Sequence, residues 1–216
     1  MKEHCKRTPG RFHAPVQAHV LLAAACSTDQ TNPTEDGGID PAETAALTEA
    51  ARGAQVQLSS LHGMRIRLYQ SSCTTSFKII EFVPVIGPDG KPVIGPDGRP
   101  IPARFTVSLG GQCDLRYFGE ASLTGTQLVV FNPDGSQSLH NETQYTVAGG
   151  DVLYAVFDGT GALSPTDPTT VTFEAWERFV GGTGQFSHAR GGAKAWGSAN
   201  LATAQGEYRT LGVIGY

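Results

Sequence analysis

The chain has few of the features that mark common enzyme classes and nucleic-acid-binding proteins. Only 17% of its 216 residues are charged, and Lys and Arg form no cluster beyond the extreme N-terminus that would bind a phosphate backbone. It contains no nucleophile elbow, phosphate-binding loop, dinucleotide fingerprint or zinc-binding helix motif. An ordinary hydrolase, kinase, dehydrogenase or nucleic-acid-binding protein is therefore disfavoured, and no cofactor is expected.

Cysteine and metal-ligating residues are also scarce. The chain has four cysteines, no Cys-x-x-Cys and no His-x-x-x-His, and His62, His140 and His188 are isolated, so no metal site is expected. Cys73 and Cys113 are the two cysteines in strand-like sequence. They are either a disulfide, if the protein reaches an oxidising compartment, or two separately buried thiols, since bridging requires Cα atoms within roughly 7 Å.

The sequence has no apolar run of the roughly 20 residues that span a bilayer as a helix. Its N-terminus instead has the order of an export signal, with basic residues before the short apolar run 16–25. This run ends on Cys26, and LAAAC at 22–26 resembles the lipobox of bacterial lipoproteins, in which the cysteine is lipidated. The alternatives are an ordinary signal peptide and a disordered tail or misassigned start.

Three segments follow from these patterns. Residues 1–25 are a predicted signal peptide, and residues 26–54 are a predicted flexible tether, polar and turn-rich at first, with helix-forming composition at 41–52. Residues 55–216 are long enough for one folded domain with a sizeable core.

The folded part has the composition of a β-protein. The chain contains 27 Gly and 13 Pro, and runs rich in Val, Ile, Phe, Tyr and Thr alternate with turn residues. Strands are predicted at 64–69, 75–83, 103–109, 114–118, 122–131, 136–147, 152–158, 169–179, 192–199 and 207–216. Antiparallel strands in this meander order can close on themselves, which removes the edges that invite aggregation.

A duplicated segment interrupts this pattern. VIGPDGKP at 85–92 is repeated as VIGPDGRP at 93–100. Each copy carries Pro-Asp-Gly, in which proline presets φ and glycine accepts the positive φ of a turn. The repeat is either an exposed hairpin tip or a recognition loop.

The glycine-rich sequence GGTGQFSHARG at 181–191 predicts a tight corner between curved strands. It resembles the corner of plant dirigent proteins and of bacterial relatives of the allene oxide cyclase barrel, as do GGDVLYAVFDG at 149–159 and QGEYR at 205–209. The resemblance covers about half of the chain. It implies an eight-stranded antiparallel barrel with an internal pocket, often assembled as a trimer. The matching motif contains none of the family's catalytic groups, so the resemblance assigns no catalytic residue in this chain.

Candidate site residues come from strand alternation. In TFEAWERF at 172–179, Glu177 shares a face with Phe173, Ala175 and Phe179, which makes it the best candidate for a pocket carboxylate. A burial-raised pKa would let it act as a general acid, whereas the alternative is a solvated residue or a surface ion pair. Tyr154, Trp176 and Trp196 are weaker candidates for ligand contacts, with packing as their alternative role.

The expected protein is an exported, lipid-anchored barrel of the bacterial cell envelope that binds a small apolar or aromatic molecule. One alternative is cyclase-like or stereochemistry-directing activity in the same pocket. Another is an envelope interaction module whose duplicated loop or subunit surface contacts another protein.

Overall fold

The computed structural model describes residues 41–216. The predictions of a signal peptide, of lipidation at Cys26 and of the first part of the tether lie outside this range. No helix among the described residues is long and apolar enough to cross a membrane. The elements are α1 (Pro41–Gly53), η1 (Leu58–Leu61), β1 (Ile66–Pro84), β2 (Pro102–Leu115), β3 (Gly119–Phe131), β4 (Gln137–Val147), β5 (Val152–Leu163), β6 (Thr170–Gly182), η2 (Gly184–Phe186), β7 (Arg190–Asn200) and β8 (Gln205–Gly215).

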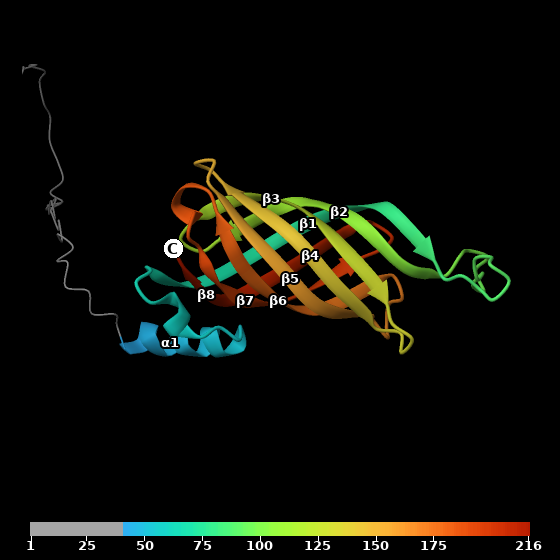
Figure 1. Ribbon diagram of the computed structural model, residues 1–216, viewed down its shortest axis with the longest axis horizontal. Helices are drawn as coiled ribbons and strands as arrows, with labels where there is room; N and C mark the ends of the chain where they lie inside the picture. The colour runs from blue at the N-terminus through green and yellow to red at the C-terminus, as the bar shows by residue number, and fades with distance from the viewer. Residues whose placement is uncertain (1–40) are drawn as a thin grey trace, which may run out of the picture. The chain divides into compact units, whose positions relative to one another are not determined.

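The eight strands form a closed antiparallel barrel in meander order (Figure 1). Each strand pairs with its neighbours in sequence, and β8 returns to pair with β1 from Ile66 opposite Gly215 to Ser76 opposite Gln205. Successive side chains of a strand point to opposite faces, so each strand places alternate residues in the barrel interior. The predicted eight-stranded antiparallel barrel is confirmed.

The main difference from the predicted strands is that two pairs of short strands are continuous. Predicted strands 64–69 and 75–83 form the single β1, and 103–109 and 114–118 form the single β2. The joining segments are polar or contain Gly110 and Gly111, so they lack the apolar pattern of a strand. Pairing across the sheet, including Cys73 opposite Cys113, holds them extended.

Helix α1 corrects the expectation that all of residues 26–54 form a tether. Leu47, Ala50 and Ala51 of α1 are buried and pack with Leu61 and Val213 on the outside of the barrel. Val213 faces away from the interior, and the helix removes this outer apolar patch from water. The folded domain therefore begins within the range predicted as tether.

One end of the barrel is closed by aromatic side chains. The rings of Phe118 and Phe186 have centroids 5.0 Å apart, and Phe118 and Tyr216 are 5.3 Å apart, both edge to face. Tyr69 and Phe179 meet next to them at 4.6 Å. Such pairs add to the stability that burial alone provides, so this end is a packed core rather than an opening.

The glycine-rich segment 181–191 forms the corner that its sequence predicted, and this corner lies at the closed end, between β6 and β7. Gly181 and Gly191 have φ values of 110° and 124°, which side-chain-bearing residues rarely adopt. A Cβ on Gly191 would overlap the carbonyl oxygen of Val213 in β8. Phe186 and Ala189 are completely buried between these glycines. The motif thus joins β6 to β7 and lets β8 approach closely, which is an architectural role.

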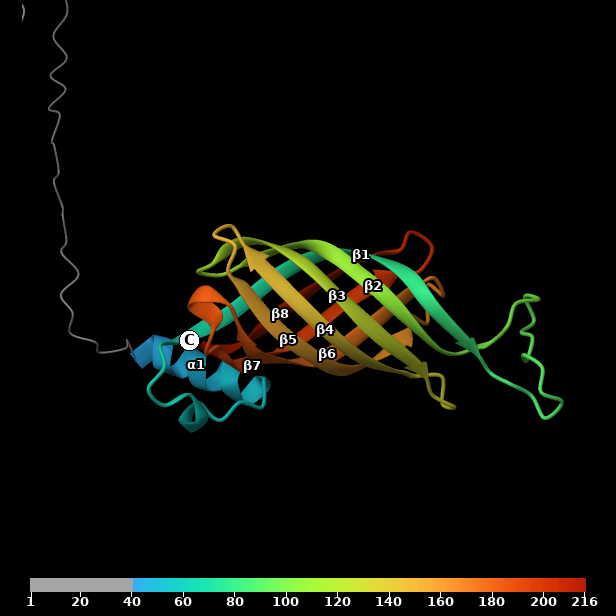
Figure 2. The ribbon, with the colours of Figure 1, turned by 45° about the horizontal axis from the view of Figure 1, so that its top comes forward.

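The opposite end carries the duplicated segment (Figure 2). It lies between β1 and β2, far from α1 in both views. Val85, Val93 and Ile101 form a ring of backbone hydrogen bonds, in which Val93 N–H donates to Val85, Ile101 N–H to Val93 and Val85 N–H to Ile101. Each repeat is therefore a compact turn, and the pair forms an exposed tip.

Candidate functional site

The barrel interior is hollow at the end that carries the duplicated loop. A cavity of about 100 Å³ is lined from all eight strands. Its wall is mostly apolar and aromatic, with contributions from Phe77, Phe105, Val107, Leu109, Leu123, Val129, Leu139, Phe157, Val171, Phe173 and Ala175. This volume is below the about 150 Å³ of an engineered cavity that holds benzene, so even a ligand with a single ring would have to extend toward the open end.

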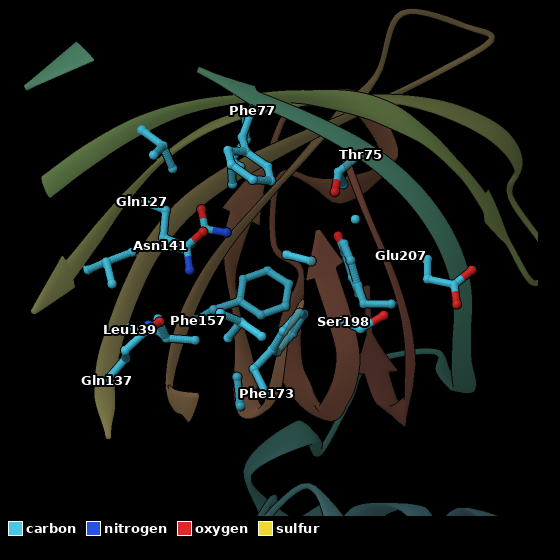
Figure 3. A pocket seen from close by; sticks show the side chains of 18 of the residues that line it. Thr75, Phe77, Gln127, Gln137, Leu139, Asn141, Phe157, Phe173, Ser198 and Glu207 are labelled. Carbon is cyan, nitrogen blue, oxygen red and sulfur yellow. The ribbon is translucent and has the colours of Figure 1, made fainter. Parts of the chain in front are cut away.

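The wall also contains polar residues, which are Thr75, Gln127, Gln137, Asn141, Ser198, Glu207 and Tyr208. Gln127 of β3 and Asn141 of β4 lie side by side, opposite the rings of Phe157 and Phe173 (Figure 3). Tyr208 of β8 lines the same space. Glu207 is at the rim, and its carboxylate points away from the rings. An apolar wall with a small number of hydrogen-bonding groups is the usual construction of a small-molecule site.

Glu177 lies deeper in the barrel, between the cavity and the closed end. Its side chain is 1% exposed, and Phe179 and Ala175 on the same face are also buried. The inward orientation inferred from alternation is therefore correct, and the alternative of a solvated carboxylate is wrong. A buried carboxylate requires hydrogen bonds or a change of protonation state.

A chain of hydrogen bonds connects Glu177 to the cavity. The Tyr145 hydroxyl donates to Glu177 Oε1 at 2.8 Å, and the Tyr145 and Tyr208 hydroxyl oxygens are 2.9 Å apart. Tyr208 also contributes to the cavity wall. The carboxyl group is thus two hydroxyls away from the space that a ligand would occupy.

Two polar atoms of this cluster have no hydrogen-bond partner among the described residues. They are Glu177 Oε2 and the hydroxyl of Tyr69, and both are buried. Nearby, the hydroxyls of Ser71 and Thr210 bond to each other at 2.8 Å. Unpaired buried polar atoms cost free energy, so Glu177 Oε2 and the Tyr69 hydroxyl mark a position that is not optimised for stability.

Burial raises the pKa of Glu177 from its ordinary value of 4.5 to about 8, although the Tyr145 hydrogen bond opposes the shift. Burial, with the charge of Glu177 as the next cause, also raises the pKa values of Tyr69, Tyr145 and Tyr208. Glu177 is then mostly a neutral acid at pH 7. A protonated carboxyl that reaches a cavity through two hydroxyls can donate a proton to a bound molecule.

The structure corrects the three predicted ligand-contact residues. Tyr154, Trp176 and Trp196 are 36%, 39% and 40% exposed and lie on the outer face of β5, β6 and β7. None of them lines the interior cavity. Trp176 and Glu177 are adjacent, so a strand that points Glu177 inward must point Trp176 outward. His188 and Arg190, in the glycine-rich corner, are exposed and lie away from the cavity.

Sequence reasoning missed Tyr145 and Tyr208, which link Glu177 to the cavity. Both alternate with small or apolar residues, Tyr145 with Thr143 and Val147 and Tyr208 with Thr210, and this could have placed them inside. Alternation could not have shown that they meet each other and Glu177, because they come from three different strands.

Cys73 and Cys113 form a disulfide with Cα atoms 4.1 Å apart. The bridge joins β1 to β2 inside the barrel, beside Tyr69, Leu115 and the other buried residues of the core. Both sulfurs are consumed in this bond, so neither is a metal ligand. Among residues 41–216, no three His, Cys, Asp or Glu side chains gather as metal ligands.

No family model matches the chain, and no curated protein is a significant match. Similar folds occur among solved structures. A Clostridium acetobutylicum protein of unknown function is 12% identical with a TM-score of 0.44, and covers 71% of this chain and 100% of its own. A conserved Rhodopseudomonas palustris protein of unknown function is 13% identical with a TM-score of 0.42, and covers 70% and 98%.

A dirigent protein described as a pterocarpan synthase is also similar, at 16% identity and a TM-score of 0.43. The match covers 73% of this chain and 96% of the dirigent protein. At these identities the neighbours carry no information about activity, which has to rest on this chain's own residues.

The buried acid predicts a pH dependence of stability. The unfolded chain loses the Glu177 proton near pH 4.5, whereas the folded protein keeps it to about pH 8. Stability from this group is fully present below pH 4.5 and is lost as pH rises to about 8. The loss is of the order of a few kcal/mol. Urea unfolding across this range should show a decrease for the wild type that Glu177→Gln largely removes.

The difference between the two proteins cancels the contributions of all the other titratable groups, which the two proteins share. Glu207→Gln is the matched control, because the Glu207 side chain is exposed, and it should leave the pH dependence unchanged. Equal slopes for the wild type and Glu177→Gln would show that Glu177 is ionised in the folded protein.

Proposed function

We propose that this protein is a carrier or receptor that binds a small, neutral, apolar or aromatic molecule inside the barrel. The observation that carries the proposal is the interior cavity, whose wall is built from Phe, Val and Leu side chains with the amides of Gln127 and Asn141 on one side. No basic side chain lines it, and the carboxylate of Glu207 points away from it, so a charged ligand would lose its hydration without compensation. A neutral ring with one hydrogen-bonding group suits this wall.

Toluene tests the apolar part of the proposal, because it is a single neutral ring. Saturation-transfer NMR should detect toluene binding to the wild type, and Val107→Phe, which fills the cavity, should weaken binding about tenfold or more. Trp196→Ala is the control, since Trp196 lies outside the barrel. Circular dichroism establishes that both variants are folded. Toluene binding that survives Val107→Phe but is lost in Trp196→Ala would place the site on the outer face.

A second function is favoured by one observation, the hydrogen-bond chain from Glu177 through Tyr145 to Tyr208. We propose that it supplies a proton to an oxygen of a ligand in the cavity, as an isomerase or cyclase of an epoxide would require. Before delivery the hydroxyl hydrogens must point the other way, with the carboxyl proton on Oε1 donated to Tyr145, Tyr145 donating to Tyr208 and Tyr208 to the ligand. Each proton then moves one place along the chain, which leaves Glu177 as the carboxylate that accepts a hydrogen bond from the Tyr145 hydroxyl. The raised pKa of Glu177 keeps this proton available at neutral pH.

Styrene oxide, a monocyclic aryl epoxide, is the probe for this activity. If the wild type opens the epoxide, Glu177→Gln and Tyr208→Phe should each lower the rate by about 10²-fold or more, because both interrupt proton delivery. Tyr154→Phe, on the outer face, should leave the rate unchanged. Retained turnover in Glu177→Gln, with the variant folded, would remove Glu177 from the mechanism. Toluene binding without epoxide opening would support the binding function and contradict the proton-donating one.

We propose that the protein works in a bacterial cell envelope, anchored through lipid on Cys26. The LAAAC sequence before the tether supports the anchor, and the Cys73–Cys113 disulfide is of the kind that persists in oxidising compartments. When the full chain is expressed in a bacterial host, mass spectrometry of the membrane fraction should find a chain beginning at Cys26 with added lipid. Cys26→Ser should abolish membrane recovery and Cys5→Ser should not. A chain with an intact N-terminus in the cytoplasm would contradict export.

A further inference from the structure

The hairpin of β1 and β2 projects beyond the mouth of the cavity. β1 pairs with β8 only as far as Ser76, whereas it pairs with β2 as far as Pro84. The projecting part ends in the duplicated loop, residues 85–100, at the end of the barrel remote from α1 (Figures 1 and 2). A partner that approaches this end along the barrel axis therefore meets the loop first.

The loop exposes one isoleucine in each of its two repeats. Ile86 and Ile94 occupy the same position of the repeat, and each is 56% exposed. Val85, Val93 and Ile101 beside them are also exposed. Single exposed apolar side chains are common on proteins, but a cluster of them in one projecting loop marks an interaction site.

The apolar surface of the loop continues along the hairpin into the cavity. Phe77 and Phe105 line the cavity. Phe82 lies opposite Phe105, and Ile79 lies opposite the cavity residue Val107. Residues opposite each other in antiparallel strands share a face, so Ile79 and Phe82 are on the cavity side of the sheet. Pairing with β8 has already ended here, and these two side chains are 51% and 44% exposed.

The backbone of the loop has few free N–H groups. Prolines occupy six of positions 84–102 and have no N–H. Nine other residues donate their N–H to acceptors within this segment, and they are Val85, Gly87, Gly90, Lys91, Val93, Gly95, Gly98, Arg99 and Ile101. Unpaired backbone groups are costly in a lipid environment, so this backbone is suited to partial burial in lipid.

Basic side chains accompany the exposed isoleucines. Lys91 and Arg99 occupy the same position of the two repeats, and both are exposed. Neither forms an ion pair within residues 41–216, and the Asp89 and Asp97 carboxylates accept hydrogen bonds from backbone N–H groups of the loop. Residues 78–104 carry four basic and three acidic side chains, although the whole chain has a net charge of −4. Basic residues beside apolar ones are typical of segments that lie on anionic lipid.

We propose that the duplicated loop docks on the surface of an anionic lipid bilayer. Ile86 and Ile94 insert among the acyl chains, and Lys91 and Arg99 contact the headgroups. A bilayer is recognised by apolar and basic side chains without a fixed register, and the loop presents both in two identical repeats. The docking does not depend on the ligand function proposed above, but it turns the mouth of the cavity toward the phase in which neutral apolar molecules dissolve.

Flotation of the full chain with lipid vesicles tests the docking, with Cys26→Ser as the parent so that no lipid anchor contributes. We expect binding to mixed phosphatidylglycerol and phosphatidylcholine vesicles, and weaker binding to phosphatidylcholine alone. Ile86→Ser with Ile94→Ser should lower the partition coefficient about tenfold or more, because less apolar surface leaves water. Lys91→Glu with Arg99→Glu should lower it to a similar extent on the anionic vesicles only.

Matched double variants change the same properties elsewhere on the barrel. Val180→Ser with Leu211→Ser removes exposed apolar side chains from β6 and β8. Arg65→Glu with Arg116→Glu reverses two exposed charges near the closed end. Both should bind vesicles as the parent does, and circular dichroism establishes that every variant is folded.

The proposal is overturned if the parent does not float with anionic vesicles. It is also overturned if neither loop variant weakens flotation, since another segment such as the apolar run 16–25 would then bind the lipid. A dimer in vesicle-free light scattering that Ile86→Ser with Ile94→Ser dissociates would assign the loop to a second copy instead. Toluene binding without vesicle binding would refute only the docking, and vesicle binding without toluene binding would refute only the ligand function.

Discussion

The structure depends on the closure of the sheet, in which the last strand returns to pair with the first from Ile66 to Ser76. Closure gives the sheet two different faces, because it converts one side into an interior without free access to water. The apolar cavity, the aromatic side chains that close one end and the buried disulfide all lie on that side. Closure also ends at Ser76, so it leaves the rest of β1 as an open edge.

Desolvation then links the fold to chemistry. Glu177 is held in a space where an ionised carboxylate is poorly solvated, and the main compensation in its surroundings is the hydroxyl of Tyr145. The protein therefore stabilises the neutral acid, whose pKa rises to about 8. The same apolar surroundings that make the acid costly also make the cavity suitable for a neutral ligand. Stability and ligand or proton chemistry compete at this position, as is common at functional sites.

The sequence predictions succeeded or failed according to what the alternation of side chains along a single strand can show. Alternation placed Glu177 among inward-facing residues, and the structure confirms it. Alternation did not show which face of β5 points inward, because both faces are apolar. Leu153, Ala155 and Phe157 lie on one face, and Tyr154 and Val156 lie on the other. Alternation also split β1 and β2, because their middle residues are polar or glycine and are held in place by the neighbouring strand.

The sequence by itself determined the strand periodicity, the turns, the glycine-rich corner and the all-β class, since these depend on neighbouring residues and their backbone preferences. Only the tertiary structure decided which residues meet. Tyr145, Glu177 and Tyr208 are separated by 32 and 63 residues in the pairs that bond, and Cys73 and Cys113 by 40. These contacts depend on the register and closure of eight strands, which no local pattern contains, because they are set by packing across the whole barrel.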